Sequence, residues 1–339
     1  MGLERLRETI GKGTSRKMKR FSHFAFLIGL VLFFYLLTKK VNLPTTWDVL
    51  KHANLYWLAA AFLFALPEIL LKGLRLHCLA SRLKSPLKYS EGVEIYLSGQ
   101  PLSTVTPGKL GDVVRVFGLS KLGKLSLPAA FSVHVSDKVY DLLTLGLLAS
   151  IGLINLVIQS QNQIPALAAL LGLLLGIGLI FLFLHPEWMR AYIKPLLLSL
   201  APKALADNIK THGSEFYSRL QELFNPPQRL VLPVLYSFLA WEVTAIRAYF
   251  CALALGLPIS LSSLALLLPV VIMVELLPIS VMGFGTREAA LFILFSSGQV
   301  APSALLSFSI LTLLVGPIFA SLLGLPSALK LSSFISKKS

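Results

Sequence analysis

The chain carries the sequence PISVMGFGTRE at residues 278–288, between apolar segments at 262–277 and 286–298. This stretch sets Arg287 beside Glu288, and charged side chains at bilayer depth cost several kcal/mol. A break rich in proline and glycine also leaves backbone groups unpaired unless they line a cavity or are buried in protein. A chain that accepts both of these energetic costs at one place is expected to bind a ligand there.

A similar sequence, PLSTVTPGKLGDVVR, occupies residues 101–115. The two stretches share three residues at the same spacing, namely Pro101, Ser103 and Gly108 in the first and Pro278, Ser280 and Gly285 in the second. We call residues 93–117 the first broken element and residues 278–288 the second broken element. Broken hydrophobic segments in corresponding places of two halves indicate a transporter site. The match is short, so an inverted repeat and a chance likeness both stay open.

The composition is that of an integral membrane protein. The chain has 339 residues, of which 55% are hydrophobic and 14% are charged. Its formal net charge is +15. The basic residues cluster between apolar segments, which indicates contact with anionic headgroups and control of topology, not nucleic-acid binding. The two cysteines, Cys78 and Cys251, lie too far apart in sequence to suggest a disulfide framework or a zinc site.

The hydropathy pattern predicts an all-α membrane protein with about eight transmembrane helices and two broken or re-entrant elements. The expected spans are 21–38, 55–71, 127–158, 164–184, 230–255, 262–277, 286–298 and 302–324. They form a single membrane domain at 21–330, flanked by a basic leader at 1–20 and a basic tail at 331–339. Residues 185–229 mix aromatic and charged side chains and are expected to form amphipathic helices on the membrane surface.

The distribution of lysine and arginine predicts the orientation. These residues gather in the leader, the tail and the segments 72–88, 109–124 and 185–229, whereas the loops at 159–163, 256–261 and 299–301 hold none. By the positive-inside rule the basic segments and both termini are cytoplasmic, in the plasma membrane. Both broken elements then start near the cytoplasmic side and are expected to dip into the membrane.

Arg287 and Glu288 are the first candidate site residues. Glu288 in a first helical turn suits the helix dipole. Neighbouring residues on a helix point about 100° apart, so the two side chains are expected to serve different partners. Arg287 is then available for a lipid phosphate, which its planar fork binds well. The alternative is an ion pair that only fixes the start of the helix.

The first broken element supplies Lys109, Asp112 and Arg115. Asp112 and Arg115 are three residues apart and can pair across one helical turn. The alternative to a substrate site is an ordinary salt bridge in a cytoplasmic loop. The first broken element resembles the second, in which Ser280 lies and which Glu275 precedes. This likeness favours a binding role for the polar and charged residues of both elements.

The span at 127–158 carries Asp137, Lys138 and Asp141. The two carboxylates are four residues apart, so they share one helix face. They either face a cavity, where they could carry protons or position a base, or neutralise nearby basic residues. Three further charges within spans, Glu68, Glu242 and Arg247, are expected to be buried pairing partners.

No motif of metal or nucleotide chemistry occurs. The six histidines show no metal-ligand spacing, and the chain has neither a Walker sequence nor a nucleophile elbow. We therefore expect no catalytic residue, no metal and no cofactor.

Three motifs together resemble one membrane family. TPGKLGDVVR at 106–115, DKVYDLL at 137–143, and LPIS with GFGTRE at 277–280 and 283–288 are similar to the flippase-like family that includes the membrane domain of lysylphosphatidylglycerol synthase. The resemblance implies an eight-span bundle that moves lipids between leaflets. It places the following residues around a central headgroup cavity: Lys109, Asp112, Arg115, Asp141, Arg287 and Glu288. The chain ends after the last span, so synthesis of lysyl-lipid by this chain alone is not expected.

These observations favour a translocase for a phosphate-containing lipid, such as an aminoacyl phospholipid or a polyprenyl-phosphate glycolipid. Its expected partners are membrane lipids with anionic headgroups. One alternative is a non-catalytic membrane subunit that recruits a separate lipid-modifying enzyme through residues 185–229. Another is a membrane-embedded lipid-phosphate transferase with Asp112, Asp137 or Asp141 as base.

Overall fold

The structure is a computed structural model that describes residues 33–160 (apart from 37 and 40), 203–276, 280–295 (apart from 281) and 300–336. Every regular element in this part of the chain is a helix, which confirms the all-α prediction. The leader at 1–20, the span at 164–184, the loop at 159–163 beyond its first two residues and nearly all of the span at 21–38 lie outside the described residues.

Four helical segments of the described chain are long and apolar enough to cross a membrane. They are α4 (Leu55–Arg82), α8 (Leu127–Ser160), the run of η3 (Pro227–Leu230) and α13 (Val231–Ala254), and the run of α16 (Pro302–Leu313), η5 (Leu314–Ile318) and α17 (Phe319–Ser336). Two of the predicted spans are shorter helices, α14 (Leu261–Leu276) and α15 (Thr286–Phe295). The count of eight spans stays a prediction.

Helix α4 extends well beyond the predicted span at 55–71. It starts at Asn54, whose side chain accepts hydrogen bonds from the backbone N–H groups of Tyr56 and Trp57, and it runs on to Arg82. Lys72 and Arg75 therefore lie inside the helix and are buried. They do not belong to an exposed basic segment as expected, because Glu68 of the same helix neutralises Lys72, and Asp137 and Asp141 of α8 neutralise Arg75 inside the bundle.

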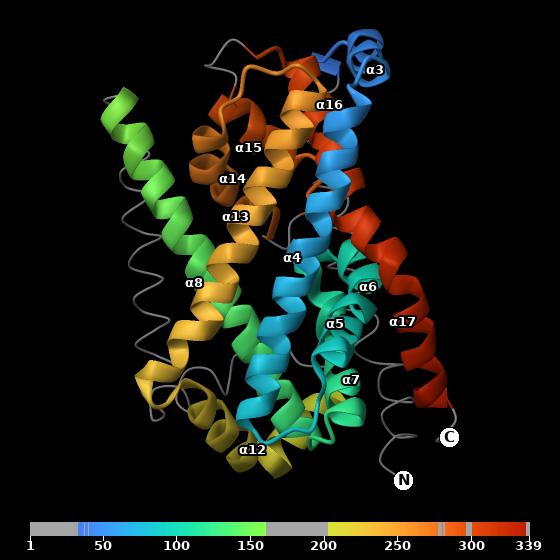
Figure 1. Cartoon of the computed structure of the whole chain (residues 1–339), viewed down its shortest axis with the longest axis vertical. Coiled ribbons are helices and arrows are strands. Elements are labelled where there is room, and N and C mark those ends of the chain that lie inside the picture. The colour runs from blue at the N-terminus through green and yellow to red at the C-terminus, as the bar shows by residue number, and fades with distance from the viewer. Residues whose placement is uncertain are drawn as a thin grey trace.

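Helices α4 and α13 pack along one another through the middle of the bundle, and α8 crosses beside them (Figure 1). Helix α14 packs against α8, and Gly152 allows the close approach. A Cβ atom on Gly152 would lie 1.8 Å from the carbonyl oxygen of Leu266 in α14. The backbones of the two helices meet there without a side chain between them, as small residues permit in membranes.

Replacing Gly152 by Ala is expected to separate α8 from α14 and to lower the free energy of unfolding by about 1–3 kcal/mol. Gly146 on the same helix is the matched control, because a Cβ there meets nothing within 4 Å. Gly146→Ala gains helix propensity and is expected to unfold at or above the wild-type temperature. Thermal unfolding in detergent measures both variants, and equal melting temperatures would contradict the close packing.

The two ends of the bundle differ. Helices α12 (Lys203–Phe224) and α7 (Arg115–Leu122) lie at the end where α4 finishes, whereas α3 (Leu43–Lys51) lies at the opposite end beside the start of α16 (Figure 1). The apolar face of α12 is buried against α8. Helices α7 and α12, which belong to the basic segments 109–124 and 185–229, thus share one end, and which side of the membrane this end faces stays a prediction.

Candidate functional site

The first broken element folds into short helices: α5 (Tyr89–Ser98), α6 (Gln100–Val105), η1 (Pro107–Val114) and the start of α7. Helix α6 packs against η1. The backbone N–H of Gly111 donates to the hydroxyl of Thr106 at 2.7 Å. A Cβ on Gly111 would lie 2.3 Å from the carbonyl oxygen of Leu102, so this close contact requires glycine. The hydrogen bond between Gly111 and Thr106 and the close contact of Gly111 with Leu102 therefore stabilise the break in the helix.

The described part of the second broken element, residue 280 and residues 282–288, forms a turn just before α15. Gly283 and Gly285 have left-handed backbone angles, with φ of 75° and 82°. Helix α15 begins at Thr286, and the carboxylate of Glu288 accepts a hydrogen bond from the N–H of Gly285 at 2.7 Å. Glu288 thus lies in the first turn, as predicted, and caps the helix start. The hydroxyl groups of Ser280 and Thr286 are 2.8 Å apart.

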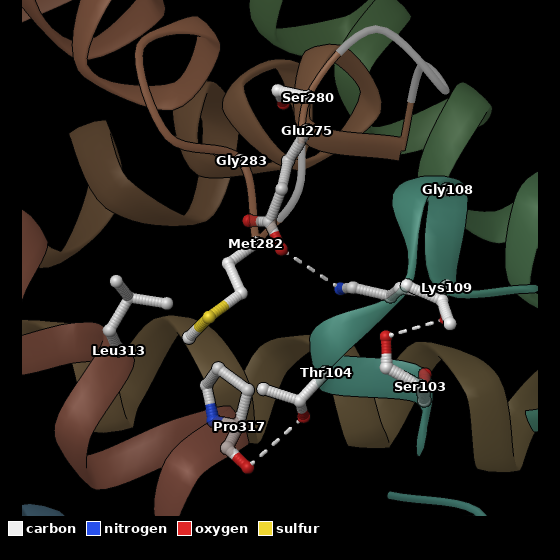
Figure 2. Close-up of a pocket in the computed structure, with 11 residues that line it drawn as sticks. Ser103, Thr104, Gly108, Lys109, Glu275, Ser280, Met282, Gly283, Leu313 and Pro317 are labelled. Atoms are coloured by element: carbon white, nitrogen blue, oxygen red, sulfur yellow. Dashed lines mark hydrogen bonds and ion pairs between the residues drawn. The ribbon is translucent and has the colours of Figure 1, made fainter. Parts of the chain in front are cut away.

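The two broken elements meet across a small hollow. Its lining residues are Ser103, Thr104, Thr106, Gly108, Lys109, Glu275, Ser280, Met282, Gly283, Leu313 and Pro317. An ion pair joins its two sides, with the Lys109 ammonium 3.1 Å from the Glu275 carboxylate (Figure 2). The Lys109 side chain is 35% exposed and that of Glu275 is 9% exposed. Lys109 therefore pairs across the hollow and not within its own element.

Backbone strain also gathers at this hollow. Four non-glycine residues of the described chain have positive φ, and two of them, Lys109 (57°) and Met282 (56°), line the hollow. A non-glycine residue in this region costs about 1–3 kcal/mol and persists only where the surroundings enforce it. Such strain concentrates at functional sites.

Arg287 and Glu288 lie beside the hollow and not in its lining. Arg287 donates from Nε to the hydroxyl of Ser309 at 3.0 Å, and Ser309 donates to Glu288 at 2.5 Å. The Arg287 and Glu288 side chains also contact one another directly, at 3.5 Å. The expectation of different partners is wrong, because Ser309 of α16 reaches between the two side chains and joins both.

Five predicted site residues belong to a second group, which we call the Arg75 cluster: Asp112, Arg115, Asp137, Lys138 and Asp141, together with Arg75. Fully buried Arg75 donates from Nε to Asp137 at 2.7 Å and from a terminal nitrogen to Asp141 at 2.5 Å. The same nitrogen also donates to the hydroxyl of Ser237 at 2.6 Å. The shared helix face of Asp137 and Asp141 is thus confirmed. One arginine from α4 neutralises both, and it ties α4 to α8 and α13.

Asp112 extends this cluster to the first broken element. Its carboxylate contacts Arg115 at 3.4 Å, which confirms the predicted pair, and also contacts Lys138. His134 lies 3.6 Å away, and Arg115 approaches Asp137 to 4.0 Å. The buried Asp112 carboxylate is therefore surrounded by the cations of Lys138 and Arg115.

The sequence interpretation missed Arg75 as a central residue. A signal was present, because Glu68, Lys72 and Arg75 recur at spacings of four and three residues and so share one face of α4. Glu68 and Arg247 are paired at 3.1 Å, as predicted for both. Within the described ranges, no three His, Cys, Asp or Glu side chains gather as metal ligands.

Comparison with known proteins gives the family. The lysylphosphatidylglycerol synthase transmembrane region matches residues 23–324. A UPF0104 membrane protein of Methanothermobacter thermautotrophicus is 23% identical over 256 residues, which cover 71% of this chain and 75% of that protein. The family match at 23–324 includes both broken elements and the Arg75 cluster. The chain therefore belongs to the family of the lysylphosphatidylglycerol synthase transmembrane region.

Proposed function

We propose that the protein is a translocase that moves a phosphate-containing lipid between the two leaflets. Candidate substrates are an aminoacyl phospholipid and a polyprenyl-phosphate glycolipid. The observation that carries the proposal is the Lys109–Glu275 ion pair, which joins the first broken element to the end of α14, just before the second broken element, across a polar hollow in an apolar helical bundle. The family, whose name refers to a lipid synthase, supports a lipid-related membrane role.

The chemistry of the hollow suits a passing headgroup. Lys109 is partly exposed, so its ammonium can exchange the Glu275 carboxylate for a lipid phosphate without moving far. Hydroxyl groups of Ser103, Thr104 and Ser280 line the same space and can donate to phosphate oxygens. The lipid tails stay in the bilayer while the elements on either side of the hollow rock against one another.

The proposal extends to the membrane arrangement. Both broken elements are taken as re-entrant, with their breaks facing the headgroup path, because irregular backbone at membrane depth is tolerated only where it lines a cavity or is buried. The end that carries α7 and α12 is taken as cytoplasmic in the plasma membrane, since the basic segments gather there.

Reconstitution tests the proposal. Sealed liposomes with the purified protein are loaded with headgroup-labelled lipids, including a polyprenyl phosphate and an aminoacylated phospholipid. The fraction of label reached by a membrane-impermeant quencher is followed over time. Faster exposure than in protein-free liposomes is expected for one lipid class. No movement of any lipid by folded protein would favour a subunit that recruits a lipid-modifying enzyme, and covalent change of a lipid would favour a transferase.

Gly283→Ala is expected to slow this movement about tenfold or more. A Cβ at Gly283 would lie 2.6 Å from Cγ of Glu275, so the carboxylate must leave its place opposite Lys109. Gly256→Ala is the control, since Gly256 also has a positive φ, of 64°, but a Cβ there meets nothing within 4 Å. Both variants carry the same backbone strain of about 1 kcal/mol. Equal rates for the two variants would contradict a role for the Glu275 position.

A further inference from the structure

We propose that Lys72 and Arg247 form a second anion site, which binds one negatively charged group such as the phosphate of a lipid headgroup. Its place on a lipid path rests on the proposed function, whereas its existence as an anion site does not. The site lies outside both the hollow and the ion pairs of the Arg75 cluster, and it joins α4 to α13.

The first observation is that two buried cations share one carboxylate. Lys72 contacts one oxygen of Glu68 at 2.9 Å, and Arg247 contacts the other at 3.1 Å. The two cationic residues are 8% and 6% exposed. No other carboxylate of the described residues lies within 4.0 Å of either cation. At contact distance the two cations therefore share a single negative charge.

A buried charge without a close counter-charge is costly. Taking the ion out of water costs several kcal/mol of free energy, and only attraction to a nearby opposite charge offsets this cost. Aromatic rings meet part of this cost: the Lys72 ammonium lies 4.6 Å from the ring centre of Trp241 and 6.0 Å from that of Tyr96. Lys72 has three N–H donors, and Glu68 is its one hydrogen-bond acceptor among the described residues. A bound anion would supply a second close negative charge for the two cations and further hydrogen-bond acceptors for Lys72.

The second observation places the cluster next to the hollow. The Arg247 guanidinium packs against η5, the single π-helical turn of the described chain, and a Cβ on Gly316 would lie 2.6 Å from its terminal nitrogen. Pro317 of the same turn, and Leu313 just before it, line the hollow. An anion released from Lys109 would therefore meet the Lys72–Arg247 pair across this turn, and π-helical turns often mark functional sites.

Equilibrium binding in detergent tests the site without any transport step. The probes are a short-chain phosphatidylglycerol, a phosphatidylcholine with the same chains, and inorganic phosphate. We expect the wild type to bind phosphatidylglycerol more tightly than phosphatidylcholine. Lys72→Gln and Arg247→Gln should each weaken phosphatidylglycerol binding about tenfold, as expected for a lost charge-assisted contact. Arg219→Gln is the control, because it removes an exposed cation of α12.

Glu68→Gln distinguishes an anion site from a structural triad. Loss of the shared carboxylate leaves two unmatched cations, so this variant should bind phosphatidylglycerol more tightly than the wild type. If it binds more weakly, as Lys72→Gln does, the three residues only hold the fold and the proposal is overturned. If Glu68→Gln does not fold, the double variant Glu68→Gln with Lys72→Gln replaces it. The double variant restores a single unmatched cation and should bind within about threefold of the wild type, and a tenfold loss would overturn the site.

The competition with inorganic phosphate and the comparison of the two phospholipids identify which anion the site binds. Competition by millimolar inorganic phosphate would assign the site to free phosphate and overturn the lipid headgroup as its ligand. Equal affinity for the two phospholipids would overturn the anion site itself. The expected order of affinities combined with an absence of lipid movement in liposomes would overturn the proposed function and leave the anion site standing.

Discussion

Arg75→Ala is expected to cost about 3–5 kcal/mol of folding free energy, because it removes the closest cation of buried Asp137 and of partly buried Asp141. Asp137 is 1% exposed, and its oxygen lies 2.7 Å from Nε of Arg75. Asp141 lies 2.5 Å from a terminal nitrogen of the same guanidinium. Total stabilities are about 5–15 kcal/mol, so this loss removes a large share of the stability and should lower the unfolding temperature markedly.

Yield from size-exclusion chromatography and the thermal unfolding temperature measure this loss. Arg75→Lys keeps the charge but not the forked geometry, so it should fall between Arg75→Ala and the wild type. Arg219→Ala is the matched control, because Arg219 is 43% exposed and its pair with Glu222 contributes little. Arg75→Ala protein that unfolds within about 1 kcal/mol of the wild type would show that Asp137 and Asp141 have other partners.

Charge reversal at the hollow is expected to have the largest effect on lipid movement. Lys109→Glu sets two carboxylates where the structure has an ion pair of 3.1 Å, and Glu275→Lys sets two ammonium groups there. Each single variant should lower the rate at least about a hundredfold, since it loses an attraction and adds a repulsion. The double variant restores an ion pair and keeps one cation in the hollow, so it should regain the unfolding temperature and part of the rate.

The exposed pair Lys330–Glu94, at 2.7 Å, is the matched control for this series. Its side chains are 54% and 27% exposed, so reversal of either charge should change the rate less than about threefold. Quencher accessibility in liposomes gives the rates. Lys109→Glu protein that is folded and moves lipid at the wild-type rate would remove Lys109 from the headgroup path.

The helices were predictable because long apolar windows leave few other structures in a membrane. The helix at 127–158 and the start of the one at 302 were placed correctly from hydropathy alone. The end of α4 was not, since Lys72 and Arg75 follow an apolar run and have the composition of a cytoplasmic loop. Only the folded bundle shows that Glu68 of the same helix makes the burial of Lys72 tolerable, and that two carboxylates of α8 do so for Arg75.

The sequence identified most residues of the site, but not the ion pairs that those residues form between helices. Spacing alone identified the Asp112–Arg115 pair and the shared face of Asp137 and Asp141, because both depend on one local helix. The Arg75–Asp137 contact joins residues 62 positions apart, and Lys109 meets Glu275 from the far half of the chain. Helix periodicity carries no information on such contacts, which depend on how helices pack.

Reversible cross-linking of the two broken elements tests the central claim most directly. Cys78 and Cys251 are first replaced, and Thr104→Cys and Met282→Cys then place one thiol on each side of the hollow. A short cleavable bismethanethiosulfonate reagent joins the two thiols in protein already reconstituted in liposomes. If headgroups pass between the broken elements, cross-linked protein should stop moving lipid and reduction should restore the rate. Full-rate movement by completely cross-linked protein would contradict the account.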